Sequence, residues 1–557
     1  MENLILLIVA AGIVIVIYSI LTKNRKKLKR LQHEWETGTF LATREEIASV
    51  SSYWKNKRSA AEWYGGVDQL TWNDLSMTKV FEKLNYTKTS VGSEYLFNQL
   101  RDIDPVLEGV ADKEKLYTLL AEDRQLREKV LLMLSGLGKR NYADSSSYFY
   151  QFNDRKIKHA YLYVVLACLP IVSIILLFFS LKVGALCLFS SFALNLIVYY
   201  RNKNRLDIDM HSITYAAAIV STGKRLATIH HPRFETFKAV FSGEGKGLRK
   251  TSFWGKALSI GGNTGGDFDA LFEYIRIVFL LDFIAYNQIV KTIAAHQKAY
   301  KQVWETIGEL DAAMAVAFYR KSLPLFTTPQ FTDKEELRFE DLAHPLIQNP
   351  VTNSSQLGKT VLITGSNASG KSTYIKAIAI NAILAQTINT ALAATWTMKP
   401  SYIVTSMAIQ DNVLDGDSYF IAEIKSLKRI IELIKANKPV ISFIDEILKG
   451  TNTIERISAS AAIMDWLAVN QGISIVASHD IELTEMAAEL YSNYHFRETI
   501  ENGEVLFDYK IHEGPSITRN AIKLLEVLDY PESITTEANQ FASHFTEERE
   551  WKRMVDV

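Results

Sequence analysis

The 557-residue chain carries 62 Lys and Arg against 62 Asp and Glu, so its formal net charge at pH 7 is zero. This length predicts about three or four domain-sized units, and the balanced charge gives no indication of a nucleic-acid or acidic partner. The two cysteines, Cys168 and Cys187, exclude a disulfide framework and a cysteine-based zinc site, which is typical of a reducing compartment.

An apolar run near the N-terminus predicts a membrane anchor. Residues 4–21 carry no charge, Glu2 precedes them, and a basic cluster at residues 23–30 follows them. A secretory signal peptide has the opposite charge order. Because 18 helical residues nearly match the thickness of a bilayer core, we expect a transmembrane anchor over residues 1–22, with the basic side in the cytoplasm. The alternative is a buried core helix.

A second apolar block, residues 160–200, contains Lys182 as its only charge and is about twice the length of one membrane span. The basic residues that flank it are Arg155, Lys156, Lys158, Arg201, Lys203 and Arg205. Because both flanks are basic, both are expected on the cytoplasmic side. The pattern predicts a transmembrane helical hairpin over residues 159–200. With the anchor, this gives three transmembrane helices in a multi-pass protein of the cell membrane, the bulk of which is cytoplasmic.

The rest of the N-terminal sequence predicts helices. Residues 23–158 form a cytoplasmic helical segment, in which amphipathic patterns on either side of Gly92 predict two helices separated by a turn. Residues 201–334 continue as helices. Within them, the basic and glycine-rich residues 243–266 predict a loop, which is either a mobile connection or a contact to phosphate or acidic lipid.

The sequence at residues 364–373 has the pattern of a phosphate-binding loop. An apolar run at residues 360–363 predicts the strand before it, and the residues that follow predict a helix. Backbone N–H groups of such a loop surround a phosphate, Lys371 is expected to reach the β- and γ-phosphates, and Ser372 to ligate Mg²⁺. The alternative is an ordinary turn. The expected ATP-binding residues are Gly365, Ser366, Asn367, Ala368, Ser369, Gly370, Lys371, Ser372 and Thr373.

Two later apolar runs end in polar side chains. Residues 440–444 precede Asp445, expected near Mg²⁺, and Glu446, expected to polarise the attacking water. Residues 473–478 predict another buried strand, and His479 directly after it is interpreted as a sensor of the γ-phosphate, although a lone histidine is usually structural. Between the loop and these strands, residues 411–423 predict the start of a helix with Ser418 as its cap.

Together these motifs resemble the MutS family of DNA mismatch-repair ATPases, a branch of the ABC-type ATPases. The similarity covers residues 344–530, with a weaker likeness at residues 70–101 and at Glu309-Leu310-Asp311. The residues that carry it are His344-Pro345, Asn367, Gly416 to Phe420 with Glu423, Asp445-Glu446, Gly450 to Thr453, Ser478-His479 with Glu482-Leu483, Gly514-Pro515-Ser516 through Leu525, and Pro531-Glu532. The resemblance implies an α/β P-loop ATPase domain of the ABC/MutS type at residues 335–557. This domain would carry a C-terminal helix-turn-helix and follow an all-α core and lever domain.

The resemblance also implies an activity and partners. It implies hydrolysis of ATP with Mg²⁺, a homodimer in which Ser418 completes the ATP site of the other subunit, and DNA binding. The chain departs from the family at Ser366, Ala368 and Ser369, which replace the usual Pro, Met and Gly, and at Asn412, which replaces an acid. Because the core-like region begins by about residue 66, we expect no mismatch-reading domain. The sequence therefore predicts a membrane-anchored ATPase coupled to non-specific DNA binding. The alternative is an ABC-like mechanochemical ATPase that acts on a membrane or protein partner without DNA.

Overall fold

The computed structural model describes residues 22–41, 45–60, 65–107, 109–150, 159–259, 267–366, 369–407, 419–501, 504–516, 521–548 and 550–551. The chain divides into two compact units. The helical unit comprises residues 1–64, 81–99 and 111–322, and the sheet unit comprises residues 65–80, 100–110 and 323–557. The apolar run at residues 4–21, predicted to be an anchor, lies outside the described residues.

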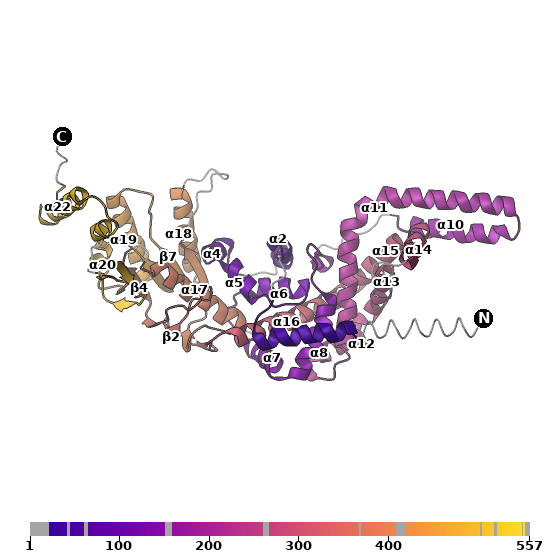
Figure 1. The fold of residues 1–557 in the computed structure, drawn as a ribbon, viewed down its shortest axis with the longest axis horizontal. Helices are drawn as coiled ribbons and strands as arrows, with labels where there is room; N and C mark the ends of the chain where they lie inside the picture. Colours follow the sequence, from indigo (N-terminus) through magenta and orange to yellow (C-terminus); the bar gives the residue numbers. More distant parts are fainter. Residues whose placement is uncertain are drawn as a thin grey trace. The chain divides into compact units, whose positions relative to one another are not determined.

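In its described parts, the helical unit is built from helices (Figure 1). They are a helix that includes residues 22–37, α2 (Ile47–Val50), α3 (Ser52–Ser59), α5 (Met77–Leu84), α6 (Ser90–Arg101), α7 (Val110–Glu122), α8 (Arg124–Leu137), α9 (Ser147–Tyr150), α10 (Tyr161–Leu177), α11 (Leu181–Leu226), η2 (Pro232–Phe234), α12 (Glu235–Ser242), η3 (Glu244–Leu248), α13 (Arg249–Ser259), α14 (Asp267–Val278), α15 (Leu281–Ala295) and α16 (Gln297–Ser322). Helices α5 and α6 each cross between the two units.

Helix α16 is largely buried, and a carboxylate on it fixes the start of α6. Asp311 is fully buried and accepts hydrogen bonds from the backbone N–H groups of Lys88 and Thr89, at 2.9 and 2.8 Å. A Cβ atom at Gly92 would lie 2.2 Å from Asp311 Oδ2. Gly92 therefore lies in the first turn of α6, not in a turn between two helices as predicted, because α6 must approach α16 closely.

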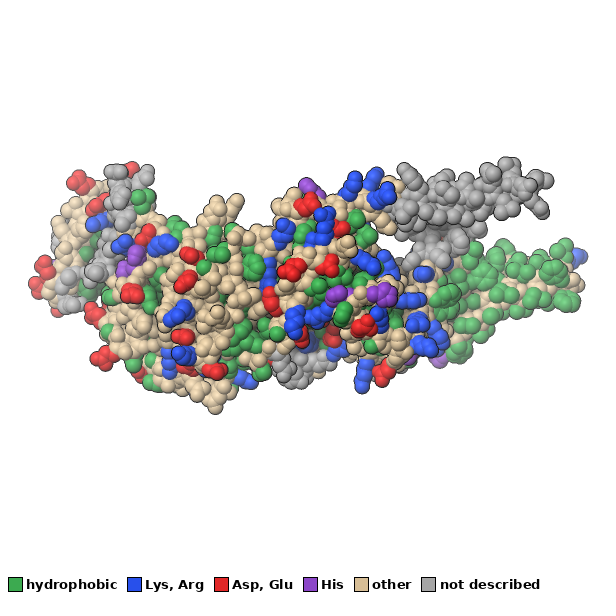
Figure 2. Space-filling view, turned by 90° about the horizontal axis from the view of Figure 1, so that it is seen from below, with side chains coloured by type: hydrophobic (Ala, Val, Ile, Leu, Met, Phe, Trp, Pro, Cys, Tyr) green, Lys and Arg blue, Asp and Glu red, His purple; other side chains and the backbone are tan. Residues whose placement is uncertain are grey.

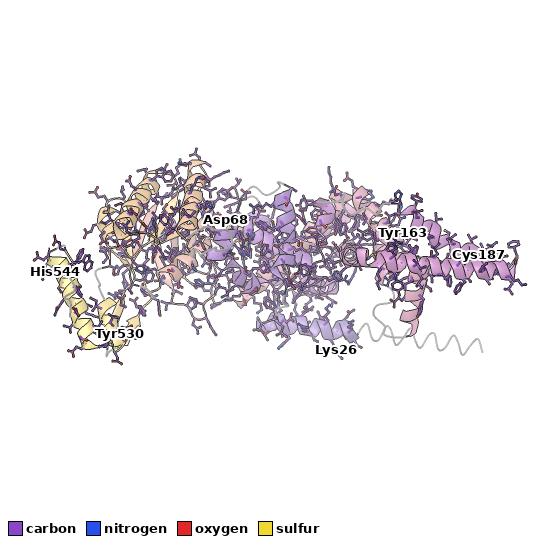
Figure 3. The ribbon with its side chains drawn as sticks, turned by 90° about the horizontal axis from the view of Figure 1, so that it is seen from above. Lys26, Asp68, Tyr163, Cys187, Tyr530 and His544 are labelled. Carbon is purple, nitrogen blue, oxygen red and sulfur yellow. The ribbon has the colours of Figure 1, made fainter. Side chains whose placement is uncertain are left out.

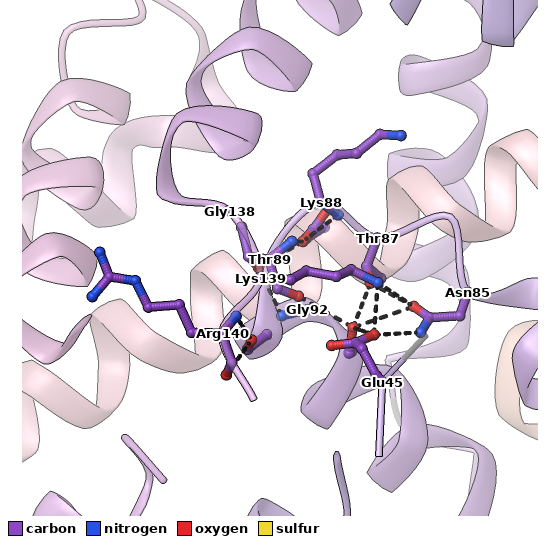
Figure 4. Close-up of polar contacts among 12 residues, drawn as sticks. Glu45, Asn85, Thr87, Lys88, Thr89, Gly92, Gly138, Lys139 and Arg140 are labelled. Carbon is purple, nitrogen blue, oxygen red and sulfur yellow. Dashed lines mark hydrogen bonds and ion pairs between the residues drawn. The ribbon is translucent and has the colours of Figure 1, made fainter. Parts of the chain in front are cut away.

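A second polar network joins four segments of the same unit. The Glu45 carboxylate pairs with Lys139 Nζ at 2.7 Å and accepts hydrogen bonds from Asn85 Nδ2 at 2.9 Å and Ser93 Oγ at 2.7 Å (Figure 4). The side chains of Glu45 and Lys139 are 6% and 11% exposed. Buried polar groups that form hydrogen bonds with one another favour a single arrangement of the chain segments that carry them. This network therefore fixes how the segments around residues 45, 85, 93 and 139 meet.

Helices α10 and α11 form the predicted antiparallel hairpin. It projects from the other helices of its unit, and its surface is covered by hydrophobic side chains; Tyr163 and Cys187 mark its two helices (Figures 2 and 3). Among the described residues, one helical stretch, Leu181–Lys203, is long and apolar enough to cross a membrane. Helix α10 is apolar but has 17 residues. Three membrane-crossing helices, as predicted, are therefore not found in the part of the chain that the structure describes.

Within the glycine-rich segment, residues 244–259 are helical, which corrects the prediction of a loop; residues 260–266 lie outside the described part. A Cβ atom at Gly247 would lie 1.9 Å from His296 Nε2, and one at Gly255 would lie 2.5 Å from the Ala217 Cβ atom. These glycines therefore allow η3 and α13 to pack closely against neighbouring helices. They do not mark a turn.

The sheet unit contains a six-stranded sheet in the order β12-β9-β4-β8-β7-β6. All neighbouring strands are parallel except β12 and β9. Its strands are β4 (Thr360–Thr364), β6 (Tyr402–Ser406), β7 (Val440–Asp445), β8 (Ile473–Ala477), β9 (Ser492–His495) and β12 (His512–Glu513). A four-stranded sheet in the order β1-β5-β2-β3 contains β1 (Gln330–Phe331), β2 (Leu337–Leu342), β3 (Asn353–Leu357) and β5 (Thr395–Met398), and β10 (Glu498–Glu501) pairs with β11 (Glu504–Phe507).

Helices pack against the six-stranded sheet. They are α4 (Gln69–Asp74), α17 (Lys371–Ile388), α18 (Tyr419–Lys435), α19 (Thr453–Val469) and α20 (Glu482–Met486). The later helices α21 (Ala521–Val527) and α22 (Glu532–Glu548) pack against each other. Every residue of the central strands β4 and β8 is buried, as expected for parallel strands covered on both faces. Leu362, Ile444 and Val476 share one buried cluster with residues of α18, α19 and α20. The predicted order, an all-α region followed by an α/β domain, is confirmed.

Candidate nucleotide-binding site

The phosphate-binding loop connects the central strand β4 to helix α17, as predicted. Gly365 and Gly370 have φ values of 140° and 111°, in the region that favours glycine. A Cβ atom at Gly365 would lie 2.6 Å from the backbone oxygen of Phe496. The loop therefore requires glycine at Gly365 both for its backbone conformation and for its contact with the segment after β9.

Lys371, the first residue of α17, is directed back into the loop. Its Nζ donates hydrogen bonds to the backbone oxygens of Gly365 at 2.7 Å and Ser366 at 2.8 Å, and the residue is 5% exposed. Burial lowers the pKa of Lys371 to about 8, although Asp445, Glu446 and other acidic neighbours oppose this shift. The ammonium group therefore remains mostly charged at neutral pH and lies where a phosphate would meet it.

Glu446 and His479 lie together beyond the ends of the neighbouring strands β7 and β8. Glu446 Oε1 is 3.1 Å from His479 Nε2, and Glu446 Oε2 is 3.1 Å from Lys449 Nζ. Burial alone would raise the pKa of Glu446, but the bonds from His479 and Lys449 outweigh it, so the pKa falls to about 2. Glu446 is therefore ionised at neutral pH, the form that can accept a proton from water.

Glu446 is held in an unusual backbone conformation. Its φ is 63°, which is uncommon for a residue other than glycine. Its backbone N–H donates to the oxygen of Ala477 at 2.9 Å, so the residue after β7 remains tied to β8. Strain of this kind persists where the surrounding structure determines it, and it is concentrated at functional sites.

Some of the other predicted site residues are described by the structure, and some lie outside the described residues. Ser369 is fully buried, Ser372 and Thr373 are exposed on the first turn of α17, and Asp445 ends β7. Hydroxyl and carboxylate oxygens such as those of Ser372 and Asp445 are of the ligand type that Mg²⁺ prefers, so the donor set fits this ion. Asn367, Ala368 and Ser418 lie outside the described residues.

A cavity of about 350 Å³ adjoins the loop, and the sequence analysis did not find it. Gly370, Thr373 and Tyr374 of the loop and α17 line one side of it. The remaining lining residues come from the segments 342–353 and 496–509: Leu342, His344, Ile347, Asn349, Pro350, Val351, Asn353, Phe496 and Tyr509. A largely apolar cavity beside a phosphate-binding loop can accommodate a nucleotide base. Of these lining residues, the sequence analysis had named His344, as part of the His344-Pro345 pair that contributes to the family resemblance.

Two supporting interactions were also not foreseen. Arg456 donates to both carboxylate oxygens of Asp480, at 3.0 and 2.6 Å, directly beside His479. Glu423 is 3% exposed, and its Oε1 accepts a hydrogen bond from the backbone N–H of Lys449 at 3.2 Å. Each contact fixes a residue next to the Glu446–His479 pair. In each contact the two residues are more than 20 positions apart in the sequence, so no local pattern predicts these contacts.

Comparison with known proteins agrees with this geometry. Residues 361–546 match the family model described as MutS domain V. The DNA mismatch repair protein MutS of Geobacillus sp. (strain WCH70) is 28% identical over 286 residues, which cover 49% of this chain and 33% of that protein. MutS protein homolog 4 of Homo sapiens is 28% identical over 294 residues, covering 49% of this chain and 31% of that protein.

The chain thus spans about a third of the length of the curated relatives that it matches. The matched domain contains the loop, Glu446 and His479. Residues 361–546 are therefore a MutS-type ATPase domain, in a chain that is distantly related to MutS proteins over about half of its length.

Proposed function

We propose that this protein is a membrane-attached ATPase of the MutS type, whose ATP binding and hydrolysis are coupled to non-specific binding of duplex DNA. The observation that carries the ATPase part is the arrangement of Lys371 inside the loop and of ionised Glu446 beside His479. This arrangement places in one site a cation that can bind phosphate, a carboxylate that can accept a proton from water, and an imidazole next to that carboxylate.

In this proposal each residue has a distinct role. Lys371 leaves the loop carbonyl oxygens to bind the β- and γ-phosphates, Glu446 accepts a proton from the attacking water, and His479 contacts the γ-phosphate. Ser372 and Asp445 would hold Mg²⁺, which would offset the charge of the phosphates. The cavity beside the loop takes the base. By resemblance to the family, the protein acts as a homodimer to which Ser418 contributes in trans.

The DNA part of the proposal is supported by the printed names of the relatives, which include DNA mismatch repair proteins. Contacts of Lys and Arg to phosphates are independent of sequence and base pairing. We expect the full-length protein to bind homoduplex and mismatched duplex equally, and to lose affinity steeply between about 50 and 200 mM salt. Titration of both duplexes at these salt concentrations tests this. A preference of about tenfold for the mismatched duplex, worth about 1.4 kcal/mol, would contradict it.

The membrane part is supported by the exposed surface of the α10–α11 hairpin. Phe178 and Phe179 at its tip are 87% and 84% exposed, and the apolar stretch Leu181–Lys203 is 17% buried. In water, an apolar surface of this extent is unfavourable unless a partner covers it. Both helices expose apolar side chains around their circumference, and lipid can cover such a surface on every side. Lipid is therefore the partner that we propose for the hairpin. At 1.5 Å per residue the 17-residue α10 is about 26 Å long, close to the thickness of a bilayer core.

The base of the hairpin has the composition of a membrane interface. Tyr161 is the first residue of α10 and Tyr200 lies within α11 near the end of its apolar stretch; they are 64% and 57% exposed, and Arg201 follows Tyr200 directly. Tyrosine and arginine are favoured at the headgroup level, on the cytoplasmic side for arginine. We therefore propose that the hairpin enters the cell membrane from the cytoplasm.

The hairpin also favours the second candidate function, an ATPase that acts on a membrane or protein partner without DNA. The same DNA titration separates the two functions. Absence of salt-sensitive DNA binding, together with ATP hydrolysis that requires Lys371, would favour the second function. Loss of ATP binding in Lys371→Ala but not in Lys376→Ala, on the same helix, checks the shared ATPase part.

A further inference from the structure

A buried carboxylate that neither the motifs nor the mechanism use lies against the phosphate-binding loop. Glu498, the first residue of β10, is 4% exposed. Its Oε2 accepts a hydrogen bond from Ser366 Oγ at 2.7 Å. The backbone oxygen of Ser366 in turn accepts hydrogen bonds from Lys371 Nζ and Ser369 Oγ, both at 2.8 Å. One residue of the loop thus links Glu498 to the lysine that is expected to meet the phosphates.

The segments that flank β10 and β11 cover this side of the loop. The backbone oxygen of Phe496 lies 2.6 Å from the position of a Cβ atom at Gly365, and the ring of Tyr509 lies 3.2 Å from that at Gly370. Glu498 lies between Phe496 and Tyr509 in sequence. The loop is therefore held from one side by Phe496, Glu498 and Tyr509, through one close backbone approach, one charged hydrogen bond and one ring contact.

The charge of Glu498 acts on the same lysine as the two acids after the loop. Lys371 interacts with the negative charges of Asp445, Glu446 and Glu498. Asp445 and Glu446 belong to β7 and its end, where the proposed Mg²⁺ would offset negative charge. Glu498 follows β9, which lies on the opposite side of β4 in the order of the sheet. Lys371 therefore lies among acids that follow strands on both sides of β4.

We propose that Glu498 sets the ATP affinity of this site: through Ser366 it holds the loop in the arrangement in which Lys371 binds the loop carbonyl oxygens, and its negative charge opposes the binding of phosphates. The proposal rests on ATP binding at this loop. Interactions between charges that are removed from water are only weakly screened, so the charge of one carboxylate beside a triphosphate changes its affinity measurably.

The test measures the dissociation constant of a fluorescent ATP analogue for the full-length protein in the presence of Mg²⁺. Glu498→Gln keeps a hydrogen-bond acceptor for Ser366 but removes the charge, and it should bind about threefold to tenfold more tightly than the wild type. Glu513→Gln is the matched control, because Glu513 is an exposed acid on β12, which pairs with β9 just before Glu498 in the chain, and it should bind as the wild type does. Equal or weaker binding by Glu498→Gln would overturn the proposal.

A second variant keeps the test decisive if Glu498→Gln does not fold. Ser366→Ala removes the hydrogen bond and leaves the carboxylate, so it should tighten binding by a smaller factor, about twofold. Binding by Ser366→Ala that is unchanged or weaker would then count against the proposal. Failure of the proposed function looks different, because the wild type and Lys371→Ala would then both fail to bind the analogue.

Discussion

Replacement of Gly365 by alanine tests whether the geometry of the loop determines nucleotide binding. The new Cβ atom would meet the Phe496 backbone oxygen at 2.6 Å and Ser369 Oγ at 3.1 Å. A backbone oxygen cannot move aside as the end of a side chain does. The φ of 140° at Gly365 is in addition nearly inaccessible to alanine.

The cost follows from these two effects. Forcing alanine into a backbone region used almost solely by glycine costs about 1–3 kcal/mol. Displacing Phe496 also endangers the hydrogen bond from its N–H to the Thr364 oxygen at 3.0 Å, which is worth about 1 kcal/mol. We therefore expect Gly365→Ala to lose about 2–4 kcal/mol of unfolding free energy. Where the protein still folds, we expect ATP affinity to fall by more than about tenfold, because the shifted loop presents its backbone N–H groups to the phosphates less well; a tenfold loss corresponds to about 1.4 kcal/mol of binding free energy.

Gly358→Ala provides the matched control. Gly358 lies between β3 and β4, seven residues earlier, and a Cβ atom there meets nothing within 4 Å. Denaturant unfolding and ATP titration of both variants decide the question. Gly365→Ala with the stability and affinity of Gly358→Ala would refute the argument that the loop requires glycine at this position.

The remaining predictions concern hydrolysis, pH and the membrane. Glu446→Gln should bind ATP as the wild type does and lose hydrolysis by about a hundredfold or more, because the proton acceptor is removed; turnover at the parent rate contradicts its role. The pKa of about 2 for Glu446 lies below its ordinary value of 4.5, so its contribution to stability is complete above pH 4.5 and is lost as the pH falls toward 2. The difference in unfolding free energy between the wild type and Glu446→Gln should therefore shrink between pH 6 and pH 3, and a constant difference would argue against this pKa. Finally, Phe189→Lys on the hairpin should reduce flotation of the protein with lipid vesicles, whereas Val469→Lys at an equally exposed apolar position of α19 should not; equal flotation of the two variants would exclude the hairpin as the membrane contact.

The placement of the site residues was predictable from the sequence because parallel strands bring their carboxyl ends together. The loop after β4, Glu446 after β7 and His479 after β8 each follow an apolar run that is visible in the sequence. In the sheet order these three strands are adjacent, so residues at their ends must meet. The 3.1 Å contact between Glu446 and His479 is the direct consequence.

Features that depend on tertiary contact were not predictable. The cavity beside the loop combines α17 with two segments that lie before and far after it in the sequence. Gly92, Gly247 and Gly255 were taken as signals of turns or a loop, but each lies where a neighbouring helix leaves no room for a Cβ atom. A glycine has the same appearance in a sequence whether it permits a positive φ or a close approach. The partner that requires the close approach is distant in the chain.

Ser366 and Glu498 show how a departure from a family pattern acquires a physical meaning only in the folded chain. A proline at position 366, the residue usual in the resembling family, has no hydroxyl group to donate. Glu498 would then lose its hydrogen bond from the loop while remaining almost fully buried, and losing a partner costs a buried charged group more than it costs a neutral one. The serine of the loop and the carboxylate 132 residues later therefore form one interaction. A change at either position therefore alters how the loop is held.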